Sequence, residues 1–267
     1  MLRTGCAGWS VTAEHAALAP GEGTHLERYA RVFDAVEINS SFYRPHRPQT
    51  YARWAQSVPE GFRFAVKMPK AISHGKRLRD SVDDLDAFLA QVRELGKTLG
   101  VLLLQLPPSL SFEPRIACAF FDALRARHDG AVACEPRHAS WFAANVDRAL
   151  RDRGIARAAA DPARVPRAAV PGGDPACEYL RLHGSPRVYH DAYAADTLDR
   201  IARRMARPSS EVRERWCIFD NTARGHAFTD ALALRTRLAH AARTTSGLDR
   251  AFAVSYHPVA PHVVRSP

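Results

Sequence analysis

The sequence predicts an α/β fold, specifically a TIM-type (β/α)8 barrel, from three observations. Its 267 residues suit one barrel domain, since such barrels contain about 250 residues. Short apolar runs that favour β-strands recur at the spacing of one strand and one helix, and segments with helical periodicity separate most of them. The runs are apolar almost throughout, which is typical of parallel strands covered on both faces. An open doubly wound sheet is the alternative.

Eight runs are the expected strands. They span residues 3–9, 35–39, 64–67, 101–105, 132–135, 157–160, 178–183 and 216–219. Apolar residues spaced three and four positions apart predict helices between them, with clear examples at 26–33, 85–99 and 116–124. The sixth helix is expected to be degenerate or replaced by a loop, because residues 161–176 contain four prolines and two glycines.

The expected domain organisation is a single barrel domain over residues 1–267. Its core covers about residues 3–242, because helical periodicity is lost after about residue 243. Residues 243–267 are therefore interpreted as a C-terminal extension.

Composition restricts the partners and the compartment. There are 38 Lys and Arg residues against 28 Asp and Glu, for a formal net charge of +10. Such a surplus favours anionic partners such as phosphates and carboxylates. No apolar stretch is long enough for a membrane span, and no secretion signal is recognisable, so a cytoplasmic protein with no membrane partner is expected.

Polar side chains gather where the expected strands end. The candidates are Glu37, Asn39, Lys67, Gln105, Glu135, Arg137, His138, Arg181, His183 and Asn221, with Trp141 shortly after the fifth strand. In parallel α/β folds the carboxyl ends of the strands meet at one face, where the following loops form the active site. We therefore expect these side chains to converge. The alternative is a closed ion-pair network, with Glu37 bound to Lys67 and Glu135 bound to Arg181.

The residue types suggest the role of each group. Glu37, Glu135 and His183 are the candidate catalytic residues, because carboxylates and imidazole transfer protons near neutral pH. The expected substrate-binding residues are Asn39, Lys67, Gln105, Arg137, His138, Trp141, Arg181 and Asn221. Arginine and lysine bind phosphate or carboxylate oxygens, and aromatic rings can stack on a substrate.

Seven motifs resemble, in order, those of the DUF72 (YecE-like) family. They are residues 5–9 (GCAGW), 36–43 (VEINSSFY), 64–67 (FAVK), 104–109 (LQLPPS), 135–138 (EPRH) with Trp141, 181–184 (RLHG) and 221–222 (NT). The resemblance covers about residues 3–240 and implies a TIM-type barrel, but it implies no reaction, because the family's activity is not established. The chain departs from the family pattern at Ser41, Pro136 and Asp220, where threonine, an aromatic residue and asparagine are common.

Two functions follow as hypotheses. The first is an enzyme acting on a small anionic, phosphate-bearing substrate by general acid–base chemistry; hydrolysis, lyase chemistry and isomerisation all remain open. The second is a nucleic-acid-binding protein, in one version a metal-dependent repair-type nuclease. Arg200, Arg203, Arg204 and Arg207 share one helix face, which is either a solvated face or a surface for a nucleic-acid backbone.

The sequence leaves the cofactor undetermined. It has no glycine-rich nucleotide-binding motif. A divalent metal is possible but less favoured than its absence, because fixed cations lie among the candidate carboxylates.

Overall fold

The computed structural model describes the backbone of residues 1–254 and the side chains of residues 1–241. Ten strands are present: β1 (Leu2–Cys6), β2 (Ala35–Ile38), β3 (Arg63–Lys67), β4 (Leu99–Gln105), β5 (Ala131–Glu135), β6 (Ile155–Arg157), β7 (Ala159–Asp161), β8 (Gly172–Gly173), β9 (Cys177–Leu182) and β10 (Glu214–Phe219). Apart from the two-residue β8, every pairing between them is parallel.

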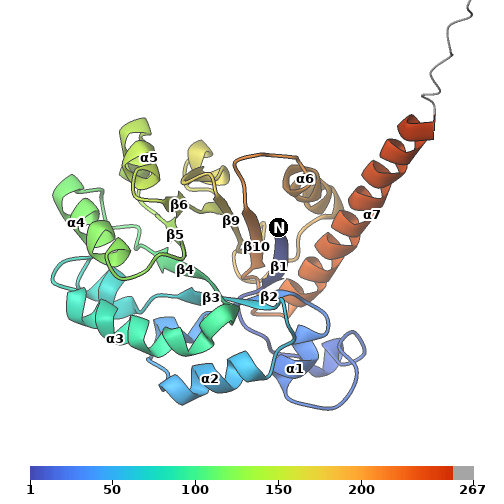
Figure 1. Ribbon diagram of the computed structural model, residues 1–267, viewed down its shortest axis with the longest axis horizontal. Helices are drawn as coiled ribbons and strands as arrows, with labels where there is room; N and C mark the ends of the chain where they lie inside the picture. Colours follow the sequence, from blue (N-terminus) through green and yellow to red (C-terminus); the bar gives the residue numbers. More distant parts are fainter. Residues whose placement is uncertain (255–267) are drawn as a thin grey trace, which may run out of the picture.

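Helices surround the strands (Figure 1). The α-helices are α1 (His25–Ala30), α2 (Pro48–Gln56), α3 (Val82–Val92), α4 (Pro114–Arg125), α5 (Ala144–Arg151), α6 (Ala195–Met205) and α7 (His226–Val254). Short 3-10 helices or π-turns follow several strands: η1 (Ala13–His15), η2 (Ser40–Phe42), η3 (Ala71–Gly75), η4 (Arg93–Thr98), η5 (Ala139–Phe142) and η6 (Pro166–Ala169). None of the described helices is long and apolar enough to cross a membrane.

The strands form a mixed α/β fold with two parallel sheets, and no closed barrel is found. One sheet has the order β1-β10-β9-β7 and the other β2-β3-β4-β5-β6-β8. The expected strand at 157–160 is divided at Ala158, and its two halves belong to different sheets. Only an isolated bridge between Ala7 and Glu37 connects the β1 and β2 edges.

The side chain of Tyr29 explains the interruption between β1 and β2. Its hydroxyl accepts a hydrogen bond from the Cys6 N–H at 2.8 Å and donates one to the Ala35 carbonyl at 3.0 Å. These two backbone groups would otherwise be available to a ladder between the strands. The ring therefore occupies the place of direct strand pairing, a tertiary contact that the strand pattern does not reveal.

The stretch between β7 and β9 contains no α-helix over its whole described length. It holds only η6 and β8, which agrees with the proline and glycine content of this segment. α7 continues without a break through residue 243, where the C-terminal extension is expected to begin, to Val254. Its first turns contact β1, β10 and α6, and its later turns extend away from the rest of the protein in Figure 1. Residues 255–267 lie outside the described part of the chain.

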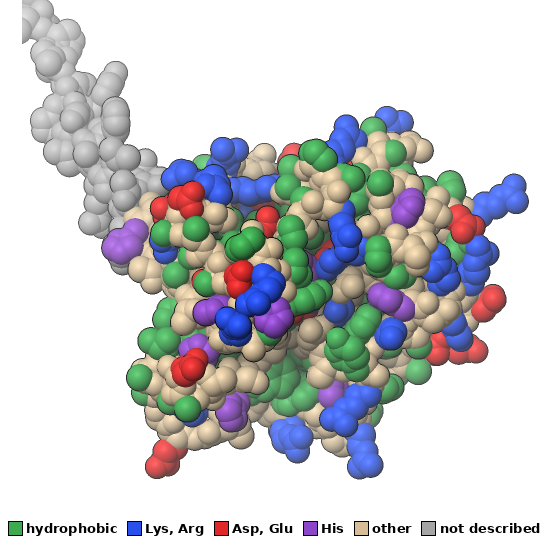
Figure 2. All heavy atoms as spheres, turned by 180° about the vertical axis from the view of Figure 1, so that it is seen from behind, with side chains coloured by type: hydrophobic (Ala, Val, Ile, Leu, Met, Phe, Trp, Pro, Cys, Tyr) green, Lys and Arg blue, Asp and Glu red, His purple; other side chains and the backbone are tan. Residues whose placement is uncertain are grey.

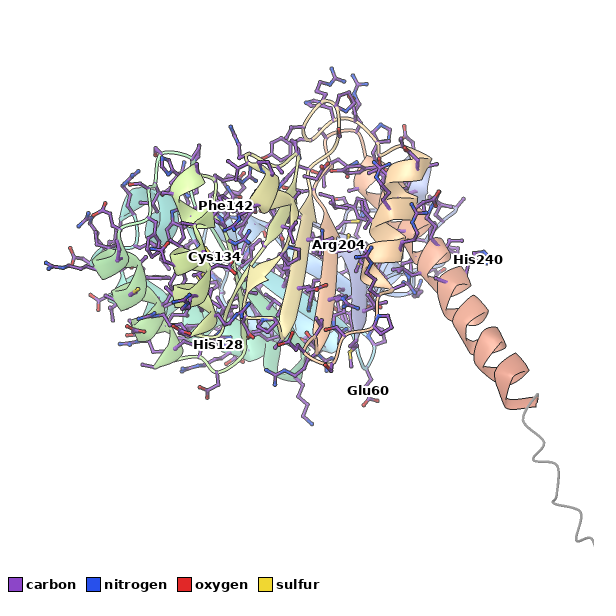
Figure 3. The ribbon with its side chains drawn as sticks, turned by 90° about the horizontal axis from the view of Figure 1, so that it is seen from above. Glu60, His128, Cys134, Phe142, Arg204 and His240 are labelled. Carbon is purple, nitrogen blue, oxygen red and sulfur yellow. The ribbon has the colours of Figure 1, made fainter. Side chains whose placement is uncertain are left out.

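The two ends of the strands carry different loops. In Figure 3, the labelled Glu60 and His128, which precede β3 and β5, lie at one end of the sheets, and Phe142, which follows β5, lies at the opposite end. Because the strands are parallel, all loops that follow them gather at the Phe142 end. We call this the carboxyl face.

Candidate active site

Residue parity places the charged side chains together. Side chains two positions apart on a strand point to the same side. Glu37, Lys67 and Glu135 therefore share a side with the alanine two positions before each of them, and all three alanines belong to one small buried apolar cluster. The same relation holds for Arg181 and Tyr179 on β9. The charged groups thus form a layer above this apolar cluster, at the carboxyl ends of the strands.

Arg181 is the centre of this layer. Its Nε and Nη2 donate to the two carboxylate oxygens of Glu37, at 2.9 and 2.6 Å, and its Nη1 donates to Glu135 at 3.0 Å. Its Nη2 also lies 3.0 Å from the carboxylate of Asp220. The Tyr179 hydroxyl donates to Glu37 at 2.8 Å. Arg181 and Glu37 are completely buried, so their charges are stabilised by this pairing and not by water.

His183 connects two carboxylates. Its Nδ1 lies 3.1 Å from Asp220, and its Nε2 lies 3.1 Å from Glu135. Arg137 approaches from the open side, with its Nη2 2.5 Å from Glu135 and 3.0 Å from the His183 Nε2. The side chain of Arg137 keeps 13% of its surface exposed, whereas Glu135 keeps none. Arg137 is therefore the edge of the network that a ligand can reach.

The network shifts the pKa values of its members. Burial by itself raises the pKa of Glu135, but Arg181 and Arg137 outweigh it and hold that pKa well below the usual value. Asp220 is similar, with burial opposed mainly by Arg181 and a net lowered pKa. For His183, burial lowers the pKa, but Glu135 and Asp220 raise it above 6.5 overall. The charged form of each group is therefore favoured.

Lys67 lies beside the network without joining it. Its Nζ makes no hydrogen bond or ion pair with any described residue, and it lies 4.2 Å from the centre of the Phe42 ring. Burial, followed by the charge of Arg181, lowers the pKa of Lys67 to about 8. The Ser41 hydroxyl fixes the backbone here, because it donates to the carbonyls of Lys67 at 2.6 Å and Ile38 at 2.9 Å.

Replacing Lys67 by methionine is expected to raise the free energy of unfolding at pH 7 by roughly 1–3 kcal/mol, since a buried charge without a partner is removed. An unfolded lysine binds its proton up to a pKa of about 10.5, but the folded one only up to about 8. The unfolded chain therefore binds more protons between these values, and the wild-type protein should gain stability as the pH rises through this range.

Urea unfolding of the wild-type and Lys67→Met proteins at pH 7 and pH 9.5 measures both effects. Lys97→Met, at the amino end of β4, is the matched control and should change neither quantity. A destabilised Lys67→Met protein at pH 7 would contradict the expectation.

Three of the expected binding residues lie away from this cluster or have other partners. Trp141 is fully buried, and its indole N–H donates to the Leu110 carbonyl at 2.9 Å. His138 caps η5, with its Nδ1 2.8 Å from the Ser140 hydroxyl. The Asn221 amide donates to the Asp191 carbonyl and to Asp230, so it anchors the loop after β9. The structure therefore gives all three a structural contact.

Asn39 and Gln105 lie at the ends of their strands and are partly exposed. The side-chain oxygens of Asn39 and Asn221 and the Nε of Arg137 are buried, yet they have no hydrogen-bond partner among the described residues. Buried polar atoms are normally paired. All three atoms belong to residues just after the carboxyl ends of β2, β5 and β10, where a ligand or water could supply the missing bonds.

His74 and Phe42 are neighbours of Lys67 that the candidate residues above do not include. The rings of His74 and Phe42 meet edge to face at 5.1 Å. Burial and then the charge of Lys67 lower the pKa of His74. Their positions in the loops directly after β3 and β2 are the only feature of the sequence that could have indicated that they lie near the site. Asp220, noted in the sequence only as a departure, is a full member of the network.

The carboxyl face is hollowed at its centre. Figure 2 shows acidic and histidine side chains at the bottom of this hollow and Lys and Arg side chains at its edges. The acidic groups of the network are turned toward guanidinium groups. Within the described residues, no three His, Cys, Asp or Glu side chains form a group that could hold a metal ion.

Comparison with known proteins agrees with the order of the motifs. The sequence model of DUF72, described as a protein family of unknown function, matches residues 3–252. The chain belongs to the DUF72 family. The UPF0759 protein YecE of Escherichia coli K12 is 36% identical over 146 residues, which are 52% of each chain. This DUF72 chain therefore aligns with about half the length of that curated relative.

Solved structures share the fold of this DUF72 protein. A DUF72 family protein from Enterococcus faecalis superposes with a TM-score of 0.74 at 21% identity, covering 99% of this chain and 100% of the other. Another from Thermotoga maritima gives a TM-score of 0.72 at 23% identity, over 90% and 99% of the two chains. At these identities the likeness concerns the fold alone.

Proposed function

We propose that this DUF72 protein is an enzyme that binds a small anionic, phosphate-bearing substrate at the carboxyl face and acts on it by general acid–base catalysis. The observation that carries the proposal is the unpaired charge of Lys67. Arg181 and Arg137 pair with the carboxylates of Glu37, Glu135 and Asp220, whereas Lys67 has no anionic partner among the described residues. A bound anion would neutralise the charge of Lys67.

The groups divide into two kinds. Glu37 and Arg181 are sealed from solvent and satisfied by each other, so they are positioning residues in this proposal. Arg137, at the open edge, and Lys67, which has no partner among the described residues, bind the anion. His183 is the general acid and Glu135 orients it, because Glu135 and Asp220 raise the pKa of His183 and so favour its protonated form.

The closed TIM-type arrangement remains part of the proposal. The Ala7–Glu37 bridge and the Tyr29 hydroxyl lie where β1 would meet β2 in a closed barrel. Catalytic groups of such barrels lie on the strand ends, as the candidates do in this chain.

Inorganic phosphate is expected to bind the wild-type protein, and Arg137→Gln should weaken that binding about tenfold because it removes a charged fork donor. Isothermal titration at low and moderate salt measures the affinity. Arg203→Gln, an exposed arginine on α6, is the matched control. Equal affinities for wild-type and Arg137→Gln proteins would remove Arg137 from the site, and no binding to wild type would defeat the proposal.

A turnover screen of phosphorylated sugars and nucleotides, repeated with His183→Asn, tests the catalytic step.

The nucleic-acid alternative relies on the arginine face of α6. Arg200 pairs with Asp196, and Arg204 donates to the Ala169 carbonyl, whereas Arg203 and Arg207 are exposed. Fluorescence anisotropy with single- and double-stranded DNA at two salt concentrations decides this hypothesis, since phosphate contacts make affinity strongly salt-dependent. If the protein binds DNA, and both Arg203→Gln and added salt weaken that binding, the nucleic-acid hypothesis would be favoured over the small-substrate hypothesis.

A further inference from the structure

We infer that Lys67 is a nucleophilic amine, and that the substrate is a phosphate-bearing aldehyde or ketone that forms an imine with the Lys67 Nζ. This inference rests on the proposed function, because it assigns a carbonyl group to the anionic substrate of the same site. It goes further in assigning Lys67 a covalent role in place of a simple charge.

The surroundings of Lys67 keep its amine available. The residue is 4% exposed, and its Nζ has no hydrogen-bond or ion-pair partner among the described residues. No described carboxylate lies within ion-pair distance, and the Phe42 ring, 4.2 Å away, offers no hydrogen-bond acceptor other than its π face. An ordinary surface lysine is protonated and hydrated, which suppresses its nucleophilicity.

The charges around the amine favour its neutral form overall. Burial and Arg181 on β9 lower the pKa of Lys67, while Glu37 on β2, Glu135 on β5 and Asp220 after β10 raise it by less. His74 in η3 is the titratable neighbour from the loop after β3. With a pKa of about 8, roughly a quarter of Lys67 carries a neutral amine at pH 7.5, against about one thousandth of a lysine with the ordinary pKa of 10.5.

The reaction balances without a further reactant. The lone pair of the neutral Nζ attacks the carbonyl carbon and gives a carbinolamine. A C=N bond then forms as the C–O bond breaks, and the oxygen leaves as water with the two hydrogens that the amine gives up. The carbinolamine oxygen takes up a proton to leave as water, and the nitrogen gives up a proton when the neutral imine forms, so no proton is gained or lost overall. Arg137 would hold the phosphate of the same molecule at the edge of the network.

Space for the rest of such a molecule lies next to Phe42. A cavity of about 350 Å³ adjoins the Phe42 ring and is lined by residues of the loops after β2 and β3, including Ser41, Phe42 and Pro69. Lys70, and not Lys67, is the lysine in its lining, so Lys70 is the lysine against which Lys67 has to be compared. This volume falls in the range of small-molecule sites. The loops that form it are the same two that fix the backbone and the ring beside Lys67.

Pyridoxal 5′-phosphate followed by sodium borohydride tests the inference, because the aldehyde forms an imine and the reductant converts it to a stable amine. The chain contains only four lysines, Lys67, Lys70, Lys76 and Lys97, so peptide mass spectrometry can assign every label. At pH 7.5 we expect Lys67 to carry at least tenfold more label than each other lysine. Pyridoxal without the phosphate should label it more weakly, and inorganic phosphate should compete.

Matched variants separate this inference from the proposed function. Lys67→Arg keeps the charge but cannot form an imine, and Lys67→Met removes both; circular dichroism establishes that each is folded. Lys97→Arg is the control and should keep the Lys67 label. If phosphate binds in an Arg137-dependent way but Lys67 is labelled no more than Lys70, the imine inference is wrong and the anion site stands. If Lys67 is labelled selectively but phosphate neither binds nor competes, the nucleophile stands and the phosphate-bearing substrate is wrong.

Discussion

Replacing Arg181 by methionine should lower the free energy of unfolding by about 3–5 kcal/mol, the cost of leaving buried charges without their partner. Methionine has a similar length and no charge, so the change removes the guanidinium while filling much of its volume. The carboxylates of Glu37, Glu135 and Asp220 would lose their shared partner, and Glu37 has no other cation within ion-pair distance among the described residues.

Urea unfolding at pH 7 measures the effect, which should also lower the melting temperature by roughly 10 °C. Arg200→Met is the matched control, because Arg200 pairs with Asp196 on the exposed face of α6 and surface pairs contribute about 0–1 kcal/mol. A loss below about 1 kcal/mol for Arg181→Met would show that the ion pairs of Arg181 contribute little to the stability of the protein.

Glu135→Gln is expected to lower the pKa of His183, because Glu135 is the carboxylate that most strongly raises it. The amide also presents an N–H group toward Arg181 and Arg137, which are donors themselves. The free energy of unfolding at pH 6 should therefore fall by about 2–3 kcal/mol. Turnover of any substrate found by the screen should fall at least tenfold, since the loss of Glu135 disfavours the protonated form of His183.

The sign of the pH dependence follows from the raised pKa of His183. The stabilising contribution of His183 is fully present below about pH 6.5 and is lost as the pH rises through the higher folded pKa. The lowered pKa values of Glu135 and Asp220 act at the acid end, where stability falls as these groups become protonated. Glu135→Gln should therefore make the free energy of unfolding much less dependent on pH at both the acid end and the neutral end of the range.

Histidine proton chemical shifts titrated by NMR give the pKa of His183, and urea unfolding across the pH range gives the slopes. Glu178→Gln is the control, because Glu178 pairs with Arg215 near the start of β9. An unchanged pKa of His183 in Glu135→Gln would mean that Asp220 alone sets it.

The positions of the charged residues could be predicted from the sequence because strand geometry is local. Side chains two positions apart on a strand point to the same side, so a polar residue at the end of an apolar run shares its side of the sheet with the buried residue two positions earlier. Glu37, Lys67, Glu135 and Arg181 follow this rule, and they converge in the structure. The replacement of the sixth helix also follows from local chemistry, since proline interrupts helical hydrogen bonding.

The partners within the site were not determined by the sequence. Of the two ion pairs in the alternative interpretation, Glu135–Arg181 is present, but Glu37 binds Arg181 and not Lys67. Which charged groups form ion pairs depends on how far each strand is shifted along its neighbour and on how far each side chain extends across the interior. Both are determined by contacts between residues that are far apart in the chain. Trp141 shows the same limitation: its position after β5 suggested a substrate contact, but the packing of η5 turns the indole toward Leu110.

The sequence by itself determined which side chains lie at the carboxyl face and which family the motifs resemble, because strand parity and loop chemistry are properties of short segments. Only the tertiary structure decided that Lys67 has no partner in the described part of the chain, that His183 joins two carboxylates, and that Tyr29 stands between β1 and β2. Each of these depends on the distances between side chains from separate elements, and those distances are fixed only when the whole core packs.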